Sequence, residues 1–448
     1  MTNKFYLQIA KHSWLLLLPL LFSCSTPDGN TKYEDAPFRQ VAVSEKLQDG
    51  YWLESADFDA DGDADLIGYG LTMGLITLYV NPGAEELNGE DPALWESRLI
   101  KELKQPVGMD HADVDQDGLM DVVICYEYGE TQKTCLRDGG KIIWMKNPGP
   151  ENKGEWEDRY IGQTMAMHRL RFGKFTQNEN LELLALPVVG DSGDIHTIIP
   201  IYYYEKPEQV LEVDRWPRTL IDSSFFEIIH DAFIVKNPAL SDFDVALIAS
   251  QQGISWLYYG RDQKWHIDNI AKGATSLEDY ENTEDWFTGT NTACPGKIGE
   301  NPFAYIAALE PFHGGIVSTY QHNPASWEWD RFVLHKYGEI DEQGYGVGHF
   351  VITQDLDGDQ NEEFLVAFPR PPKGVLYVKP LDLEQNLYDT LRVSGESAAR
   401  ITIDDYNLDG KPDFATIGYN VPGYYEDPSP RVLVFLNNEP PLTAKKEE

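Results

Sequence analysis

The sequence predicts an all-β fold, a seven-bladed β-propeller whose ring is closed by the N-terminal strand completing the last blade. Three observations support this fold: an acidic loop motif recurs along the chain, its copies are almost evenly spaced, and β-branched and aromatic runs occupy the intervals. The chain has 448 residues, of which 42% are hydrophobic, so it can bury a large core.

The acidic motif carries oxygen-bearing side chains at relative positions 1, 3, 5 and 9, and an apolar run follows each copy. Four copies are acidic throughout and three are degenerate. Position 1 of the seven copies falls at residues 57, 113, 174, 236, 297, 355 and 405, so the steps are 56, 61, 62, 61, 58 and 50 residues. Such a period is too long for helical repeats and suits a blade of four strands.

The rest of each repeat is typical of further strands. A second apolar run ends in Pro or Gly, and an outer run then opens on an aromatic residue such as Trp95 or Trp156. The last repeat ends at residues 432–437 without an outer run. The run that begins at Phe38 would supply it and leave no open sheet edge, so we expect the propeller to span residues 37–440.

The N-terminus has the composition of an export signal. Lys4 and Lys11 precede an apolar stretch at residues 14–22, which is too short to span a bilayer. Cys24 follows in a context that resembles a bacterial lipobox, so we expect its lipidation after removal of residues 1–23 as a lipoprotein signal peptide. The alternative is an ordinary signal peptide with a cysteine at this point by chance.

These features predict a lipid-anchored protein of the bacterial cell envelope, either periplasmic or at the cell surface. Residues 24–36 would form a flexible tether and residues 441–448 a disordered tail. No later segment is long and apolar enough to span a membrane, so we expect membrane contact only through the lipid anchor.

The charge balance argues against nucleic acid as a partner. The 36 basic and 74 acidic residues give a formal net charge of −38, which would repel a polyanion. The same charge also serves plain solubility.

Three cysteines follow Cys24. Cys125 and Cys135 lie in one short loop and could form a disulfide in an oxidising compartment, or could remain thiols. Cys294 is left over, and we expect it to be buried. No Cys-x-x-Cys spacing occurs, which argues against a structural zinc site.

The four acidic loops predict calcium sites with a structural role. Oxygen ligands at positions 1, 3, 5 and 9, with a backbone carbonyl from position 7, would surround one hard cation in the way that suits Ca²⁺. An EF-hand is the alternative, but it needs Glu at position 12 and flanking helices, and neither is present. The predicted ligand residues are Asp57, Asp59, Asp61, Asp63 and Asp65; Asp113, Asp115, Asp117, Leu119 and Asp121; Asp355, Asp357, Asp359, Asn361 and Glu363; and Asp405, Asn407, Asp409, Lys411 and Asp413.

The three degenerate loops share a substitution at position 1, where Lys174, Lys236 and Lys297 replace the aspartate. We expect each ammonium group to stand in the place of the cation and to neutralise its loop without metal. All seven loops would then mainly fasten the strands of their blades.

Histidines recur at one register of the repeat. His168, His230 and His349 each lie six residues before position 1, and His111 lies two before it, on the same face of a strand. That strand should be the innermost of its blade, so these side chains should line the central channel. His313, in a loop of the fifth repeat, could reach the same rim.

Four histidines on one channel face favour a functional site over structural roles for each. They could bind a divalent transition metal or act as general acid and base. Strand alternation would turn Arg169, next to His168, to the opposite face, where it would be structural. The aromatic residues Tyr51, Trp52 and Tyr345 near the strand starts would suit a ligand the size of a sugar.

Two resemblances add to this interpretation. The acidic loops resemble FG-GAP and VCBS-type propeller repeats, which carry little functional information. Across roughly residues 37–440, the stretches that begin at Leu66, Pro106, Met167, Phe303 and Phe414 resemble, in order, the propeller domain of the aldos-2-ulose dehydratase family.

The second resemblance implies a dehydration reaction. That family converts keto-sugars such as 1,5-anhydro-D-fructose to an enone, ascopyrone, and its cupin and lectin-like modules carry a later isomerisation. Since these 448 residues contain only the propeller, the resemblance implies at most the dehydration half.

We therefore expect an exported hydro-lyase that removes water from a keto-sugar at a histidine-lined site on the propeller axis. His168, His230 and His349 would contact the substrate or a metal, with His111 and His313 next to them. The first alternative is a non-catalytic glycan-binding or scaffold lipoprotein. A polysaccharide lyase is the second, although anionic polyuronates would require a basic cleft.

Overall fold

The computed structural model describes residues 37–130, 134–190, 196–275, 288–341, 346–422 and 425–438, and the fold and contacts below are those of these residues. The expected signal peptide, the lipidation site Cys24, the tether, Tyr345 and the C-terminal tail lie outside them. Among the described helices, none has the length and apolar character that a membrane crossing needs.

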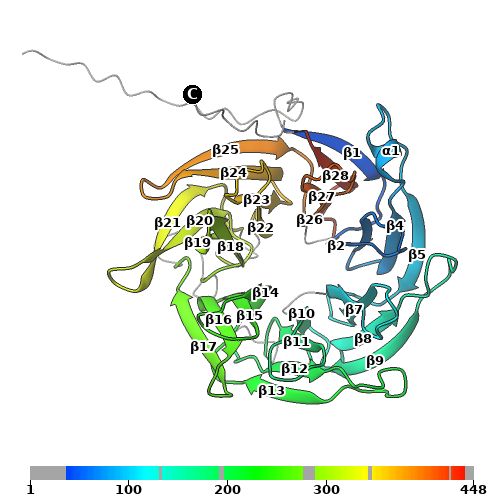
Figure 1. Cartoon of the computed structure of the whole chain (residues 1–448), viewed down its shortest axis with the longest axis horizontal. Coiled ribbons are helices and arrows are strands. Elements are labelled where there is room, and N and C mark those ends of the chain that lie inside the picture. The colour runs from blue at the N-terminus through cyan, green and yellow to red at the C-terminus, as the bar shows by residue number, and fades with distance from the viewer. Residues whose placement is uncertain are drawn as a thin grey trace, which may run out of the picture. The chain divides into compact units, whose positions relative to one another are not determined.

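Seven four-stranded antiparallel sheets surround a common axis in the described part of the chain (Figure 1). Each sheet is one blade, and its strands follow one another from the axis outward, except that blade 7 takes its outermost strand from the N-terminus. A four-residue helix, α1 (Ala84–Leu87), interrupts a loop of blade 1. The prediction of a seven-bladed β-propeller is confirmed.

Each blade is built from four strands, ordered from the innermost to the outermost. Blades 1 to 3 contain β2 (Trp52–Ala56), β3 (Asp65–Tyr69), β4 (Leu75–Val80) and β5 (Glu96–Glu102); β6 (Gly108–Ala112), β7 (Asp121–Tyr126), β8 (Lys141–Lys146) and β9 (Glu157–Gln163); and β10 (Met167–Gly173), β11 (Glu182–Pro187), β12 (Ile201–Glu205) and β13 (Arg218–Asp222). Blades 4 and 5 contain β14 (Ile229–Lys236), β15 (Asp244–Ser250), β16 (Gly253–Tyr259) and β17 (Trp265–Ala271); and β18 (Thr292–Ile298), β19 (Asn301–Glu310), β20 (Ile316–Asn323) and β21 (Glu328–Lys336). Blades 6 and 7 contain β22 (Phe350–Gln354), β23 (Glu363–Phe368), β24 (Gly374–Asp382) and β25 (Leu387–Ser394); and β26 (Arg400–Asp404), β27 (Asp413–Ile417), β28 (Val432–Asn437) and β1 (Phe38–Ser44).

The N-terminal strand closes the ring. β1 pairs antiparallel with β28, so that Val41 lies opposite Val434 and Phe38 opposite Asn437. In Figure 1 the blue strand β1 lies beside the dark red strand β28. The last blade is thus completed by the first strand, as the missing outer run predicted.

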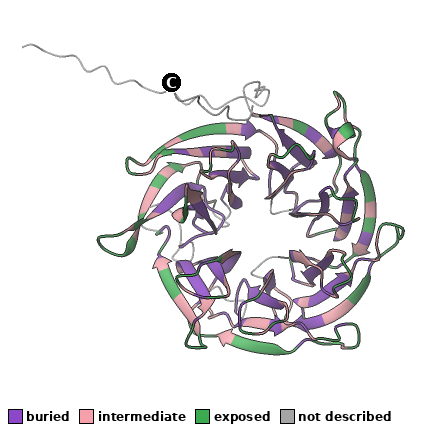
Figure 2. Cartoon of the chain, in the orientation of Figure 1, coloured by how far each residue is buried: buried purple, intermediate pink, exposed green. Residues whose placement is uncertain are grey.

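Burial follows the position of a strand within its blade (Figure 2). Strand β3, the second strand of blade 1, is buried at every residue because neighbouring sheets cover both of its faces. Strand β5, on the outside of the same blade, exposes residues to solvent along much of its length. The hydrophobic core therefore lies between the blades, and the functional question concerns only the innermost strands and the loops at their ends.

The acidic loops tie each blade together and join it to the blade before it. In blade 1 the buried Asp65, at position 9, accepts hydrogen bonds from the backbone N–H groups of Phe58 at 3.0 Å and Asn81 at 2.8 Å. The amide of Asn81 in turn donates to the carbonyl oxygen of Tyr406 in blade 7. Asn147 and Asn437 make the matching contacts from blades 2 and 7.

We predict that the closing strand is needed for the stability of the whole ring. Val41→Asp should lower the free energy of unfolding by about 3 kcal/mol or more, because it places a charge in the seam with β28. Gln40→Asp, at an exposed position of the same strand, is the matched control and should change stability little. Urea denaturation followed by tryptophan fluorescence measures both, and equal stability of the two variants would contradict the prediction.

Candidate functional site

The innermost strands bring one register of the repeat together at one end of the axis. Six residues before position 1, the seven blades contribute Tyr51, Val107, His168, His230, Asn291, His349 and Ala399. Three predicted site histidines belong to this ring of residues. His313 joins them from the loop between β19 and β20, where Asn291 Oδ1 accepts a hydrogen bond from its backbone N–H at 3.0 Å.

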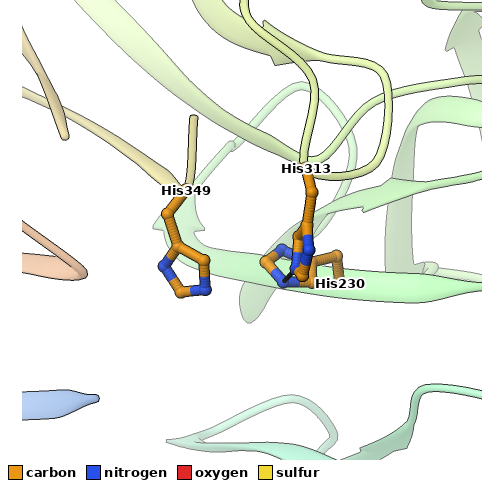
Figure 3. A group of neighbouring side chains, drawn as sticks. All are labelled: His230, His313 and His349. Atoms are coloured by element: carbon orange, nitrogen blue, oxygen red, sulfur yellow. Dashed lines mark hydrogen bonds between the residues drawn. The ribbon is translucent and has the colours of Figure 1, made fainter. Parts of the chain in front are cut away.

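Three imidazoles converge within the range of one metal ion (Figure 3). Ring nitrogens of His230, His313 and His349 lie within 4.8 Å of one another, and the Nε2 atoms of His230 and His313 are 3.2 Å apart. All three side chains are buried. His168 packs beside them, with its ring centroid 5.3 Å from that of His230.

Backbone carbonyl groups set the tautomers of two of these rings. The Nδ1 atom of His230 lies 3.1 Å from the carbonyl oxygen of Asn291, and Nδ1 of His349 contacts that of Ala399. Since a carbonyl can only accept, each Nδ1 carries the hydrogen and each Nε2 presents a lone pair. This is the arrangement that orients histidine as a metal ligand.

Burial lowers the pKa of all four imidazoles, and the positive charge of Arg169 lowers it further. The pKa of His349 falls to about 3, and those of His168, His230 and His313 fall well below the ordinary value of 6.5. The rings are therefore neutral near pH 7, which favours metal binding and disfavours a role as proton donor.

The structure does not bring His111 to this group. On β6 it lies four residues further along the innermost strand, which corresponds to about 13 Å at the rise of a β-strand. Its Nδ1 is 3.8 Å from Glu54 Oε2, and its ring packs against Phe58. Glu54, Asp110 and His111 form a separate group further down the channel. A shared strand face was therefore not enough to predict that His111 joins the other histidines, because residues on one face can lie at different heights along the axis.

The expectation that Arg169 points away from the site is wrong. In β10, Met167 pairs with Pro187 and Arg169 pairs with Leu186, so His168 is an extra residue in a β-bulge. A bulge breaks the alternation of side chains and re-aims them. Arg169 Nη1 consequently lies 3.0 Å from His168 Nε2. β14 has the same irregularity at His230.

A layer of buried charges lies next to the histidines. Arg169, Asp231 and Arg400 each lie one residue beyond the histidine register, and Arg171 lies three residues beyond it. Asp231 Oδ2 accepts from Arg400 Nη1 at 3.0 Å, while Asp231 Oδ1 accepts from Arg171 Nη2 at 2.9 Å and lies 3.4 Å from Arg169 Nε. Burial alone would raise the pKa of Asp231, but Arg400, Arg169 and Arg171 outweigh it and hold this pKa at about 2.

Aromatic rings complete the layer. The Arg400 guanidinium carbon lies 3.9 Å from the ring centroid of Trp52 and 4.0 Å from that of Phe350. Three guanidinium groups lie around the carboxylate of Asp231, and the carboxyl group of Glu54 also interacts with Arg400 and Arg171. The layer therefore places positively charged groups directly beside the imidazoles. Negative charge that develops on a bound molecule would be stabilised there.

The histidines open onto a small pocket at this end of the axis. Its lining is aromatic and apolar with a few polar groups. The lining residues are Tyr51, Leu71, Val107, Tyr128, Glu130, His168, Val188, His230, Phe312, His313 and Tyr419. Tyr51, which the sequence marked only as an aromatic residue near a strand start, shares the register of the histidines.

The cysteines take no part in this site through a disulfide. Among the described residues, Cys125, Cys135 and Cys294 form no disulfide, and Cys294 is buried as expected. The loop that contains Cys125 and Cys135 is therefore not cross-linked in this structure.

Lysines occupy acidic loops in a pattern that differs from the expected one. In the degenerate loops, Lys236 Nζ lies 2.5 Å from Asp244 Oδ1. Within the described residues, Lys174 and Lys297 engage carboxylates through their backbone N–H groups instead. In two fully acidic loops a lysine enters from the third strand: Lys146 Nζ lies 2.5 Å from Asp117 Oδ2 in blade 2, and Lys379 Nζ lies 3.0 Å from Asp359 Oδ2 in blade 6.

Comparison with known proteins finds a family of similar propellers. The sequence model of the aldos-2-ulose dehydratase β-propeller domain matches residues 139–323. Aldos-2-ulose dehydratase of Phanerodontia chrysosporium is 32% identical over 422 residues, which cover 89% of this chain and 46% of that protein. The propeller of this chain is thus similar in sequence to the propeller domain of aldos-2-ulose dehydratase. The chain spans just under half the length of that relative.

Similarity to solved structures supports only the fold. BBS1N, from its complex with ARL6DN, matches with a TM-score of 0.52 at 9% identity, over 91% of this chain and 98% of that chain. An ancestral GH74 enzyme matches with a TM-score of 0.50 at 10% identity, over 89% of this chain and 48% of that one. At such identities the likeness concerns blade architecture and says nothing about chemistry.

We predict that the metal-free propeller loses stability as the pH falls from about 6.5 toward 3. In that interval the unfolded chain binds protons on its histidines, whereas folded His349, with a pKa of about 3, does not. Each such histidine then lowers the free energy of unfolding by up to about 1.4 kcal/mol per pH unit.

Urea denaturation in a chelator at pH 7, 6 and 5 measures this effect. In His349→Gln, the free energy of unfolding should fall less steeply with decreasing pH than in the unaltered protein. In His322→Gln, which changes an exposed residue, it should fall as steeply as in the unaltered protein. The same decline in all three proteins would contradict the assignment to the buried imidazole.

Proposed function

We propose that this propeller is a hydro-lyase that eliminates water from a keto-sugar, such as 1,5-anhydro-D-fructose, in the histidine-lined pocket on its axis. The observation that supports this most directly is the convergence of three neutral imidazoles beside a pocket on the axis. The similarity to a protein named aldos-2-ulose dehydratase gives the reaction class.

We further propose that His230, His313 and His349 hold one divalent metal ion. Their nitrogen donors fit it: two Nε2 lone pairs are set by backbone carbonyl groups, and the buried Nε2 of His349 has no hydrogen-bond partner among the described residues. Three protein ligands leave coordination positions open for a substrate, as in catalytic zinc sites. Such an ion, when bound, would polarise the ketone and make the α-hydrogen more acidic.

The surrounding residues supply orientation and charge. His168 Nε2 accepts from Arg169 Nη1, so its Nδ1 carries a hydrogen, and no described residue accepts it. That N–H can donate to a substrate oxygen. The positively charged groups around Asp231 stabilise an enolate, which is the intermediate that loss of an α-proton would generate.

The proposed activity has a direct assay. Incubation with 1,5-anhydro-D-fructose and related keto-sugars should produce an enone, seen as a new ultraviolet absorbance. His230→Ala and His349→Ala should each lower kcat/KM at least about 100-fold and lose the bound metal, because each removes one of three ligands. His322→Ala, at the exposed outer edge of blade 5, should keep activity and metal. Binding of the sugar without any enone would instead support a glycan-binding protein.

We also propose that Ca²⁺ binds the acidic loop of blade 1 more readily than those of blades 2 and 6. Lys146 and Lys379 place their ammonium groups among the carboxylates of the latter two loops. The matching strand position in blade 1 is Val80, which brings no charge. An ammonium group among the ligands competes with the cation for the same oxygen atoms.

Calorimetric titration of metal-free protein with Ca²⁺ tests the lysines. Lys146→Leu should add a binding site or tighten one, and should increase the rise in Tm that Ca²⁺ causes. Lys153→Leu, which removes a lysine exposed at the surface, is the control and should leave the titration unchanged. If both variants bind Ca²⁺ as the unaltered protein does, Lys146 does not compete.

A further inference from the structure

We propose that Tyr51 carries the proton in this elimination, from the α-carbon of the keto-sugar to the hydroxyl group that leaves, and that Arg169 is its positioning residue. This inference rests on the proposed function and adds the residue that moves the proton. It concerns the same pocket, because Tyr51 lines it together with His168, His230 and His313.

The place of Tyr51 in the repeat puts its phenol at the height of the histidines. It lies six residues before position 1 of blade 1, the register at which blades 3, 4 and 6 contribute His168, His230 and His349. Its ring centroid lies 5.6 Å from that of His349, and the side chain is 2% exposed. A substrate whose ketone faces the three imidazoles therefore has Tyr51 beside it.

Arg169 provides the charge that a proton-carrying phenol needs. Its Nη1 donates to Tyr51 Oη at 3.2 Å, and Oη lies 3.4 Å from His168 Nε2. Arg169 is fully buried, and it shares the carboxylate of Asp231 with Arg171 and Arg400. Its guanidinium group is thus a positive charge in direct contact with the phenol oxygen, where it would stabilise negative charge.

The other groups at the pocket are less suited to this task. His230, His313 and His349 direct ring nitrogens toward one another, which is the arrangement of ligands rather than of a base for the substrate. The Nε2 lone pair of His168 accepts from Arg169. Glu130, the carboxylate among the lining residues, is exposed at the rim. Tyr128 and Tyr419 also line the pocket, but neither belongs to the ring of residues six positions before position 1. The geometry therefore points to Tyr51.

In the elimination of water, Tyr51 alone can accept the proton and return it. The Tyr51 phenolate, paired with Arg169, takes the α-proton, and the electron pair of the C–H bond becomes the new carbon–carbon double bond. The β C–O bond breaks and its electron pair stays on oxygen, which receives the same proton from Tyr51 and leaves as water. The products are the enone and water, the phenolate is regenerated, and no oxidant or reductant is consumed.

Tyr51→Phe tests the proposal, because it removes one oxygen atom and keeps the ring. Enone formation from 1,5-anhydro-D-fructose should show kcat lowered by about 10²- to 10⁴-fold with KM little changed. Metal content and Tm should equal those of the unaltered protein. With substrate deuterated at the α-carbon, the residual reaction should show a larger isotope effect than the unaltered enzyme, which a merely structural phenol would not cause.

Tyr69→Phe is the matched control. Tyr69 is also a buried tyrosine of blade 1, but it does not line the pocket, and its hydroxyl has no hydrogen-bond partner among the described residues. It should keep full activity.

The possible failures can be told apart. A Tyr51→Phe protein that retains more than about a tenth of kcat, or that loses its metal together with its activity, overturns the role of Tyr51 and leaves the hydro-lyase in place. If the unaltered protein forms no enone from any keto-sugar tested, the proposed function and the role of Tyr51 both fall.

Discussion

Ring closure is the constraint on which the rest of this structure depends. Because β1 completes the sheet of β26, β27 and β28, all seven blades are held around one axis, and their innermost strands must converge. Residues at one register, about 60 positions apart in the sequence, then become neighbours. His168, His230 and His349 meet for this reason, although no local segment contains more than one of them.

β-Bulges determine which side chains the converging strands direct toward the pocket. A regular strand would alternate between the channel and the neighbouring blade, but the extra residue at His168 and at His230 re-aims the side chains around it. Imidazoles and guanidinium groups can therefore lie in successive layers beside one another. Burial, together with the positive charge of Arg169, keeps the imidazoles neutral, and the same charge favours negative charge on the molecule that occupies the pocket.

The acidic loops have a different task, which is to hold the blades together. Position-9 carboxylates such as Asp65 accept backbone N–H groups, and Asn81 joins blade 1 to blade 7. Cations, whether Ca²⁺ or a lysine ammonium group, would add to this fastening from outside the channel. The residues that reveal the fold in the sequence are thus separate from the residues that form the pocket, and each set can vary without the other.

The sequence alone determined the number of blades, the closure by the first strand and the register of three site histidines, because spacing and period-2 alternation are local properties of a chain. Tertiary structure decided the rest. It excluded His111, since height along the axis separates it from the other rings, and it brought Arg169 and Tyr51 to the site. A β-bulge shifts the pairing of strands but cannot be recognised from the amino-acid composition. A buried charge acts on residues of neighbouring blades. Both effects arise only when the strands are packed together.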